Sequence, residues 1–128
     1  MSVFQMLGEM EYGPAKEAIT IAHGEYKGHQ FKVWDHGTHP TAYVSVQNGK
    51  ALDTNDIYCH GGVTWINNHL PDEEPTDDIW WIGWDYAHWG DYIWSPTATM
   101  GKRWTRAEIV NECLHVIDQL EDKDGRST

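Results

Sequence analysis

One amphipathic helix near the C-terminal end of the chain constrains the fold most. Thr105 is expected to be its N-cap, Glu108 completes a Thr-x-x-Glu capping box, and Trp104 is placed to staple onto Ile109. Apolar side chains then recur at helical spacing in one stripe: Ile109, Cys113, Val116, Ile117 and Leu120. Because a one-sided helix has to bury such a stripe, we expect it to pack on one face of a β-sheet.

The sheet is expected from segments that alternate in polarity or are rich in β-branched residues. The expected strands are 17–23, 29–35, 41–46 and 79–84, with turns at 25–28 and 47–50 and a shorter apolar run at 57–66. Pro40 should not lie inside a central strand, because proline cannot donate a ladder hydrogen bond. The run from Ile79 to Trp84 is almost continuously apolar, which predicts a strand buried on both faces near the middle of the sheet.

These elements predict an α+β fold with a small antiparallel or mixed β-sheet and a C-terminal α-helix packed on one face. At 128 residues, the chain has the usual size of one domain. We expect a core over about residues 17–120, an exposed acidic loop over about 67–78 and a flexible tail at 121–128.

Charge and composition exclude several classes of protein. The formal net charge is −11, and no lysine or arginine lies between Lys50 and Lys102, so direct nucleic-acid binding by phosphate neutralisation is not expected. The sequence has no apolar run long enough for a membrane span and no signal-peptide pattern. Cys59 and Cys113 match no zinc or redox spacing and are expected to be free thiols in a cytoplasmic protein.

The segment "GWDYAHWGDY", residues 83–92, concentrates the candidate chemistry. Asp85, His88 and Asp91 recur every three residues directly after the apolar strand. Carboxylate and imidazole ligands suit a divalent metal such as Mg, Mn or Zn, and the same groups can act as general acid and base. The alternative is structural: the two aspartates cap backbone amides in a turn, and His88 is a buried, hydrogen-bonded histidine.

Two other polar segments accompany it. His60-Gly61-Gly62 places an imidazole beside two residues without side chains, which lets a ligand approach the backbone or simply forms a turn. The loop containing His36 and His39 either lines a pocket or is ordinary polar loop. The chain holds eight tryptophans, most of which should be core, with one or two free to stack on a planar ligand.

The motifs "HPTAYV", "HGGVT" and "GWDYAHWGD", followed by a helix containing "EIVNEC", resemble a family of short, uncharacterised bacteriophage and prophage proteins. The resemblance covers roughly residues 28–120 and departs from the family pattern at Tyr86, where many members have cysteine, and at Trp89. It implies that these positions belong to the site: His39, Tyr43, His60, Gly61, Gly62, Thr64, Asp85, His88 and Asp91. It also implies a counter-defence role in the cytoplasm of an infected bacterial host.

The leading hypothesis is a tryptophan-walled pocket that processes a small nucleotide-like ligand, by metal-assisted hydrolysis or by His/Asp acid–base chemistry. The expected catalytic residues are His60, Asp85, His88 and Asp91. Asp85, His88 and Asp91 are also the expected metal ligands. The expected ligand-binding residues are His39, Tyr43, Gly61, Gly62, Thr64, Trp65, Trp84 and Trp89.

Two alternatives remain open from the sequence. The same pocket could sequester a nucleotide immune signal without changing it, or the acidic surface could inhibit a host defence protein. Whether the chain is an enzyme is therefore undecided at this point. The excess of tryptophan over the needs of one core also predicts a homo-oligomer.

Overall fold

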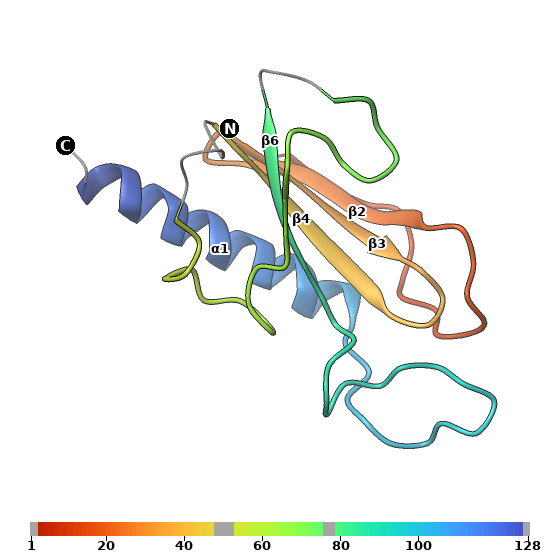
Figure 1. Ribbon diagram of the computed structural model, residues 1–128. Helices are drawn as coiled ribbons and strands as arrows, with labels where there is room; N and C mark the ends of the chain where they lie inside the picture. The colour runs from red at the N-terminus through yellow and green to blue at the C-terminus, as the bar shows by residue number, and fades with distance from the viewer. Residues whose placement is uncertain (1–2, 48–52, 76–78, 127–128) are drawn as a thin grey trace.

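The computed structural model describes residues 3–47, 53–75 and 79–126 and has an α+β architecture, with one helix packed against an antiparallel sheet (Figure 1). The elements are β1 (Val3–Met6), β2 (Ile19–Tyr26), β3 (His29–Asp35), β4 (Pro40–Val46), β5 (Trp65–Asn67), β6 (Trp80–Asp85) and α1 (Arg106–Arg126). The six strands lie in the order β1-β2-β3-β4-β6-β5, so the sheet is larger than the small sheet that the sequence predicts. Every neighbouring pair is antiparallel.

The β2–β3 hairpin is confirmed, but its turn is tighter than the expected 25–28. Tyr26 pairs with His29, so that Lys27 and Gly28 form a two-residue loop. Both have positive φ angles, 50° and 83°, as a type I′ turn requires. β4 begins at Pro40, in agreement with the expected strand at 41–46. Of the turn expected at 47–50, positions 48–50 lie outside the described residues.

The predicted strand at 79–84 exists as β6, but its expected place near the middle of the sheet is wrong. β6 lies between β4 and the edge strand β5. Its apolar residues are covered on one face by the cluster that includes α1 and on the other by a cluster that includes Leu70. Burial on both faces therefore comes from these two covers rather than from a central position.

Two strands, β1 and β5, differ from what the sequence predicts. β1 was not expected, and the run at 57–66 forms a strand only from Trp65, the start of β5. The core also reaches further toward the N-terminus than residue 17, since Met10 is buried within it.

The helix begins as predicted and ends later. Glu108 N–H donates to Thr105 Oγ1 (3.3 Å), and Thr105 N–H donates to Glu108 Oε1 (3.1 Å), which completes the capping box. The five residues of the stripe are all buried in the main core. The expected tail from residue 121 is wrong as far as Arg126, because α1 continues to that residue.

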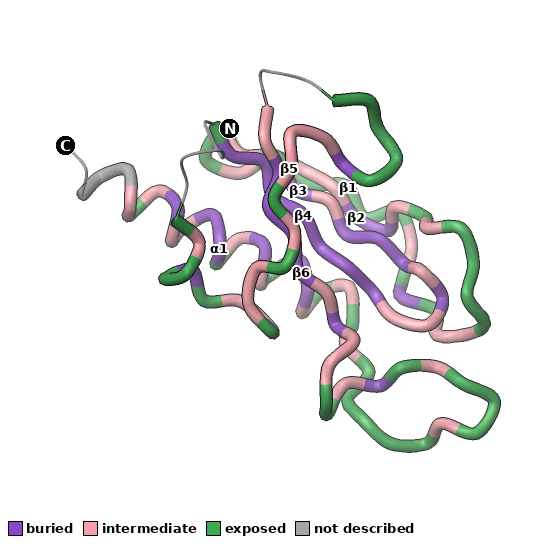
Figure 2. Tube along the Cα trace, in the orientation of Figure 1, coloured by how far each residue is buried: buried purple, intermediate pink, exposed green. Residues whose placement is uncertain are grey.

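Apolar side chains form two cores on the two faces of the sheet. The larger one lies between α1 and the sheet (Figure 2). The smaller one, on the opposite face, consists of Trp34, Tyr43, Leu70 and Trp81. Leu70 belongs to the segment expected as an exposed acidic loop; residues 71–75 are exposed, and 76–78 lie outside the described residues. Within the described residues, no helix combines the length and apolar character that a membrane crossing requires.

The capping box supplies a stability test. Replacing the capping hydroxyl by Thr105→Ala should lower the free energy of unfolding by about 1 kcal/mol, because a backbone N–H at the start of α1 loses its acceptor. Urea denaturation would measure this loss. Thr99→Ala, an exposed threonine in a loop, is the matched control and should change stability little. Equal effects of the two variants would contradict the role of the cap.

Candidate functional site

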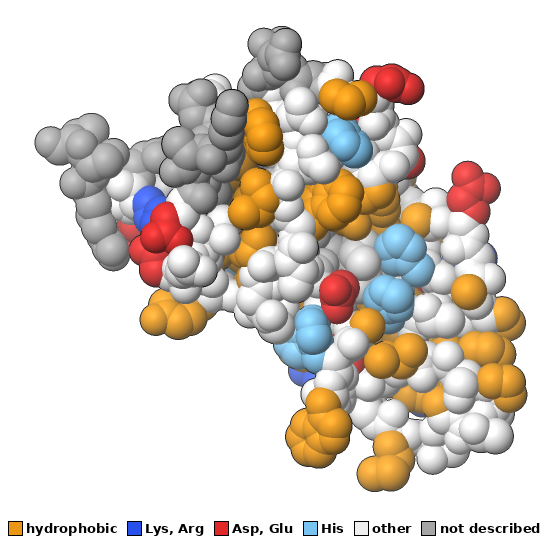
Figure 3. Space-filling model, viewed as in Figure 1, with side chains coloured by type: hydrophobic (Ala, Val, Ile, Leu, Met, Phe, Trp, Pro, Cys, Tyr) orange, Lys and Arg blue, Asp and Glu red, His pale blue; other side chains and the backbone are white. Residues whose placement is uncertain are grey.

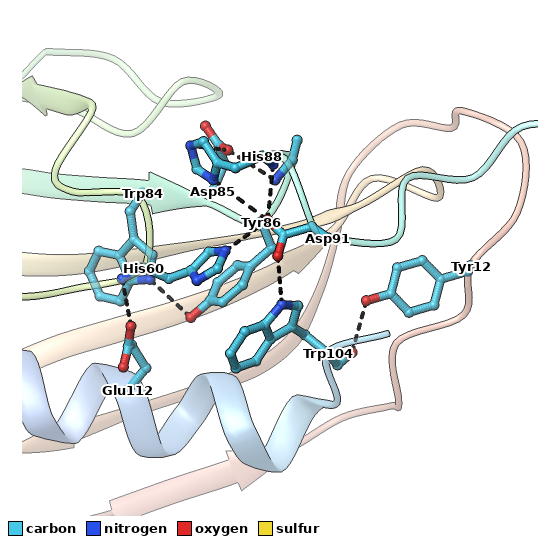
Figure 4. Close-up of polar contacts among 10 residues, drawn as sticks. Tyr12, His60, Trp84, Asp85, Tyr86, His88, Asp91, Trp104 and Glu112 are labelled. Atoms are coloured by element: carbon cyan, nitrogen blue, oxygen red, sulfur yellow. Dashed lines mark hydrogen bonds and ion pairs between the residues drawn. The ribbon is translucent and has the colours of Figure 1, made fainter. Parts of the chain in front are cut away.

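Polar side chains from three segments meet at one end of the sheet, where β6 ends. The first segment is the turn 59–62, the second is the stretch 85–91, which starts with the last residue of β6, and the third is the stretch just before α1 (Figure 4). We call this group the His/Asp corner; it consists of His60, Asp85, His88, Asp91 and Trp104. The sequence could name four of these residues but not their convergence.

The carboxylate of Asp91 joins the three segments. Its Oδ2 accepts hydrogen bonds from His60 Nε2 (2.7 Å) and from the His88 backbone N–H (2.9 Å). Its Oδ1 accepts one from the Trp104 indole N–H (2.9 Å). The Asp91 side chain is only 3% exposed, so these donors take the place of water.

The same contacts keep Asp91 ionised. Burial by itself raises the pKa of the Asp91 carboxyl, but hydrogen bonds from the His88 amide, the His60 ring and the Trp104 indole outweigh it. The pKa of Asp91 therefore lies below its ordinary value. The His/Asp corner thus holds a permanent negative charge beside two imidazoles at neutral pH.

His88 lies between two carboxylates. Its Nε2 is 3.3 Å from Asp85 Oδ1, and its Nδ1 is 3.6 Å from Asp91 Oδ2. Asp85 is held in place because Oδ1 also accepts the Ala87 N–H (3.1 Å). Among the described residues, Nδ1 of His88 finds no hydrogen-bond partner although the atom is buried. This nitrogen is therefore available to a water molecule or to a cation.

Gly61 makes room for the His88 ring. A Cβ atom at Gly61 would lie 2.2 Å from His88 Cε1, a distance that real Cβ atoms do not show. Gly61 also has a φ of 72°, and the Gly62 N–H donates to Cys59 C=O (3.0 Å), the pattern of a type II turn with glycine at its third position. The Gly-Gly pair is therefore explained first by the turn and by the close approach of His88.

The turn holds His60 from two sides. Its backbone N–H donates to Glu112 Oε1 of α1 (2.7 Å). Its ring stacks on Tyr86, with ring centroids 4.8 Å apart and planes 5° from parallel, and it also contacts Trp104 at 4.9 Å. These contacts fix the imidazole with Nε2 toward Asp91.

Two further histidines extend the polar surface beside the corner. His39 interacts electrostatically with Asp85 and His88, and its ring stacks on His36 at 5.3 Å. Burial is the main cause that lowers the pKa of both rings, so both are neutral at neutral pH. In Figure 3, histidine side chains (pale blue) gather around an acidic side chain on the face shown.

Three residues expected to bind a ligand are part of the two cores instead. Trp84 is 1% exposed, and its indole N–H donates to the Tyr86 hydroxyl (3.0 Å). Tyr43 is buried in the smaller core, where its ring lies against Gly83, and Trp65 packs on the same core. The buried rings of Trp84 and Tyr43 offer no surface to a ligand, whereas Trp65 is only partly buried.

Three other expected residues are at or near the surface. Thr64 is exposed, and its backbone N–H donates to Gly83 C=O (2.9 Å). Gly62 serves the turn through its φ of 81°. Trp89 is 101% exposed, so its indole touches no part of the fold and stands free next to His88.

The sequence reading missed three residues of the site. Trp104 was expected only as a helix staple, and Glu112 and Tyr86 were given no role. Tyr86 was singled out in the sequence only through the hypothesis of a resemblance to phage proteins, which nothing here tests. The Tyr86 ring supplies the surface on which His60 stacks.

Neither cysteine fits a nucleophilic mechanism. Both thiols are free. Burial raises the pKa of the Cys59 thiol to about 12, and it also raises the pKa of Cys113. The thiolate, which is the reactive form, is therefore scarce at neutral pH in both residues.

His60, His88 and Asp91 together could hold a metal ion. Each offers one ligand atom, and the three atoms lie within 4.8 Å of one another. This set keeps two of the three expected ligands and replaces Asp85 by His60. Asp85 instead lies on the far side of the His88 ring, where it can orient that ring.

The close contact at Gly61 can be tested with its neighbour as control. Gly61→Ala should destabilise the protein by about 1 kcal/mol or more, through its positive φ and its clash with the His88 ring. Gly62→Ala has the same backbone cost but no atom within 4 Å, so His88 should not move. NMR of the imidazole resonances and urea denaturation would compare them. Unchanged His88 resonances in Gly61→Ala would contradict the packing.

The lowered pKa of His36 predicts a pH dependence. Because the folded state resists protonation of a ring that the unfolded chain protonates below about pH 6.5, stability should fall as the pH drops through that value. His36→Asn should lose less stability than the wild type between about pH 7.5 and about pH 5.5 in urea titrations. His115→Asn, on the exposed face of α1, is the control. An identical loss of stability in wild type and His36→Asn would contradict a contribution of His36 to this pH dependence.

Three comparisons with known proteins assign the chain to no family. No protein-family model matches the chain, and no curated protein or solved structure matches it either. The resemblance to the phage proteins therefore stays a hypothesis, and the function has to be argued from the His/Asp corner itself.

Proposed function

We propose that the His/Asp corner binds a divalent metal ion and hydrolyses a small, anionic, nucleotide-like ligand. One observation carries the proposal: His60, His88 and Asp91 place three potential ligand atoms within 4.8 Å of one another at a partly exposed end of the sheet. Two imidazoles and a carboxylate suit zinc and manganese, and three protein ligands leave a position open for water or substrate.

The residues fit such an ion with a small adjustment. Ligand atoms of a tetrahedral zinc site stand about 3.4 Å apart. The 3.6 Å between His88 Nδ1 and Asp91 Oδ2 matches that spacing, and this nitrogen is the buried atom without a hydrogen-bond partner among the described residues. His60 Nε2, at 2.7 Å from Asp91 Oδ2, would give up its proton and move slightly away.

Asp85 has the place of a supporting residue in this arrangement. In metal sites, a ligating histidine usually has a carboxylate or carbonyl at its other ring nitrogen, which sets the tautomer and the ring orientation. Asp85 lies at Nε2 of His88 and so favours the tautomer with its lone pair on Nδ1, toward Asp91. We therefore assign His60, His88 and Asp91 as ligands and Asp85 as the residue that orients His88.

A bound divalent cation would supply a positive charge that attracts an anionic group and lowers the pKa of a coordinated water. This matters in a chain of net charge −11, whose own field repels phosphate. His39 is neutral at neutral pH and lies near Asp85 and His88, so it is placed to accept a proton. Asp91, already ionised, needs no proton transfer before it binds a cation.

Trp89 supports a ligand with a planar ring. The Asp91 N–H donates to His88 C=O (2.9 Å), which closes a turn with Trp89 and Gly90 at its centre. Gly90 has a φ of 94°, and Asp91 also binds the His88 N–H, so the turn is tied at both ends. An exposed indole on a fixed turn is a ready surface for a base, and such stacking contributes about 1–3 kcal/mol per base.

The resemblance to phage proteins gives this proposed chemistry a biological setting. A small protein that destroys a nucleotide immune signal in an infected bacterium would act as a counter-defence enzyme. A protein that only sequesters the signal would use the same residues without turnover. The two roles differ in the fate of the ligand, and one experiment separates them.

Metal binding is tested first, by calorimetric titration of the protein with Zn²⁺ and Mn²⁺. His88→Ala should abolish most of the binding, and Asp85→Asn should weaken it by about 10- to 100-fold, as expected for a residue that orients a ligand. His23→Ala, on β2, is the control and should bind like wild type. Equal metal affinity in wild type and His88→Ala would remove the basis of the proposal.

Turnover is tested by incubating the metal-loaded protein with cyclic and linear nucleotides, followed by chromatography before and after heat denaturation. A new nucleotide species that is absent with His88→Ala supports hydrolysis. Ligand that disappears and returns intact on denaturation contradicts hydrolysis and identifies sequestration. A panel that is unchanged throughout contradicts both roles.

A further inference from the structure

The two edges of the sheet differ in how they are protected. Natural sheets keep edge strands from pairing with other chains by making them short or by placing charges on them. β5 is only three residues long. β1 lies at the other edge, and from Val3 to Gly8 it and its continuation have no ionisable side chain.

The β1 edge also exposes apolar side chains. All of β1 is exposed, and Val3, Met6 and Leu7 have exposed fractions of 52%, 44% and 58%. A groove of about 200 Å³ adjoins this edge, between Met6 and the first turns of α1. Its lining is mainly apolar: Met6, Arg106, Ala107, Val110, Asn111 and Leu114. This edge is thus an uncharged, apolar strip with a groove beside it.

We infer that the β1 edge joins two copies of this chain, with β1 pairing antiparallel to β1 of the second copy. The net charge of the chain indicates where two copies can meet. Two chains of net charge −11 repel each other, so they associate most readily where neither presents a charge, and residues 3–8 form such a strip. A strand that pairs with its own copy about a two-fold axis needs no second, complementary surface.

The pairing would cover the groove as well as the strand. Phe4 and Met6 alternate with Val3 and Gln5, and Phe4 packs on Phe31 of the main core, so Phe4 and Met6 lie on the helix side of the sheet. A two-fold axis perpendicular to the sheet keeps both helices on the same side. The two grooves would then adjoin across the axis, and apolar side chains of each copy would enter the other's groove.

The inference is independent of the proposed metal site, because the His/Asp corner uses neither β1 nor the groove. Sedimentation equilibrium of the full chain over a range of concentrations, at low and moderate salt, tests it. Wild type should be a dimer, and salt should strengthen it because it screens the repulsion between the two chains. Met6→Lys should shift the protein to a monomer, since it places like charges across the axis.

Met100→Lys is the matched control, because Met100 is another exposed methionine, 84% exposed in a distant loop, and its variant should stay dimeric. Circular dichroism would verify that each variant is folded, and Val3→Lys replaces Met6→Lys if the latter unfolds. A wild type that is monomeric up to millimolar concentration would overturn the inference. A folded variant with a lysine in β1 that stays dimeric would also overturn it. So would a Met100→Lys variant that becomes monomeric.

Discussion

The buried carboxylate of Asp91 is the interaction on which the His/Asp corner depends. It accepts three hydrogen bonds, one from the turn 59–62, one from its own segment and one from the stretch before α1. Because the Asp91 side chain is only 3% exposed, water could not take the place of these three donors. Without this carboxylate, two ring N–H groups and a backbone N–H would each need a new partner, and three chain segments would lose their common contact.

The surrounding fold positions these donors. β6 pairs with β4 along its whole length, which places Asp85 opposite Thr41 at the end where the corner lies. The capping box starts α1 directly after Trp104, and Glu112 on its second turn holds the backbone of His60. The geometry of the corner therefore depends on the helix and on the sheet together. The His60 ring stacks on Tyr86, which is buried in the main core, so this contact joins the corner to that core.

The sequence predicted the elements whose signals are local. The capping box identified the start of α1, and the alternation of polar and apolar residues identified β3. It missed β1, since four residues give too little pattern to distinguish an edge strand. It placed β6 wrongly. A continuous apolar run indicates that both faces of a strand are buried, but it does not indicate where in the sheet the strand lies. The convergence of His60 and Asp91, 31 positions apart, depends on tertiary packing that no spacing rule describes. For the same reason the sequence did not show that Trp84, expected to bind a ligand, is buried in the main core.

The proposed function requires that a divalent ion binds among His60, His88 and Asp91. The most direct measurement is anomalous diffraction from crystals grown with Zn²⁺ or Mn²⁺. We expect an anomalous peak at about 2.0–2.2 Å from a nitrogen of each imidazole and from an Asp91 oxygen, with Asp85 still beside the far nitrogen of His88. A structure without that peak, in which His60 remains hydrogen-bonded to Asp91, would contradict the claim and leave the corner as a structural support.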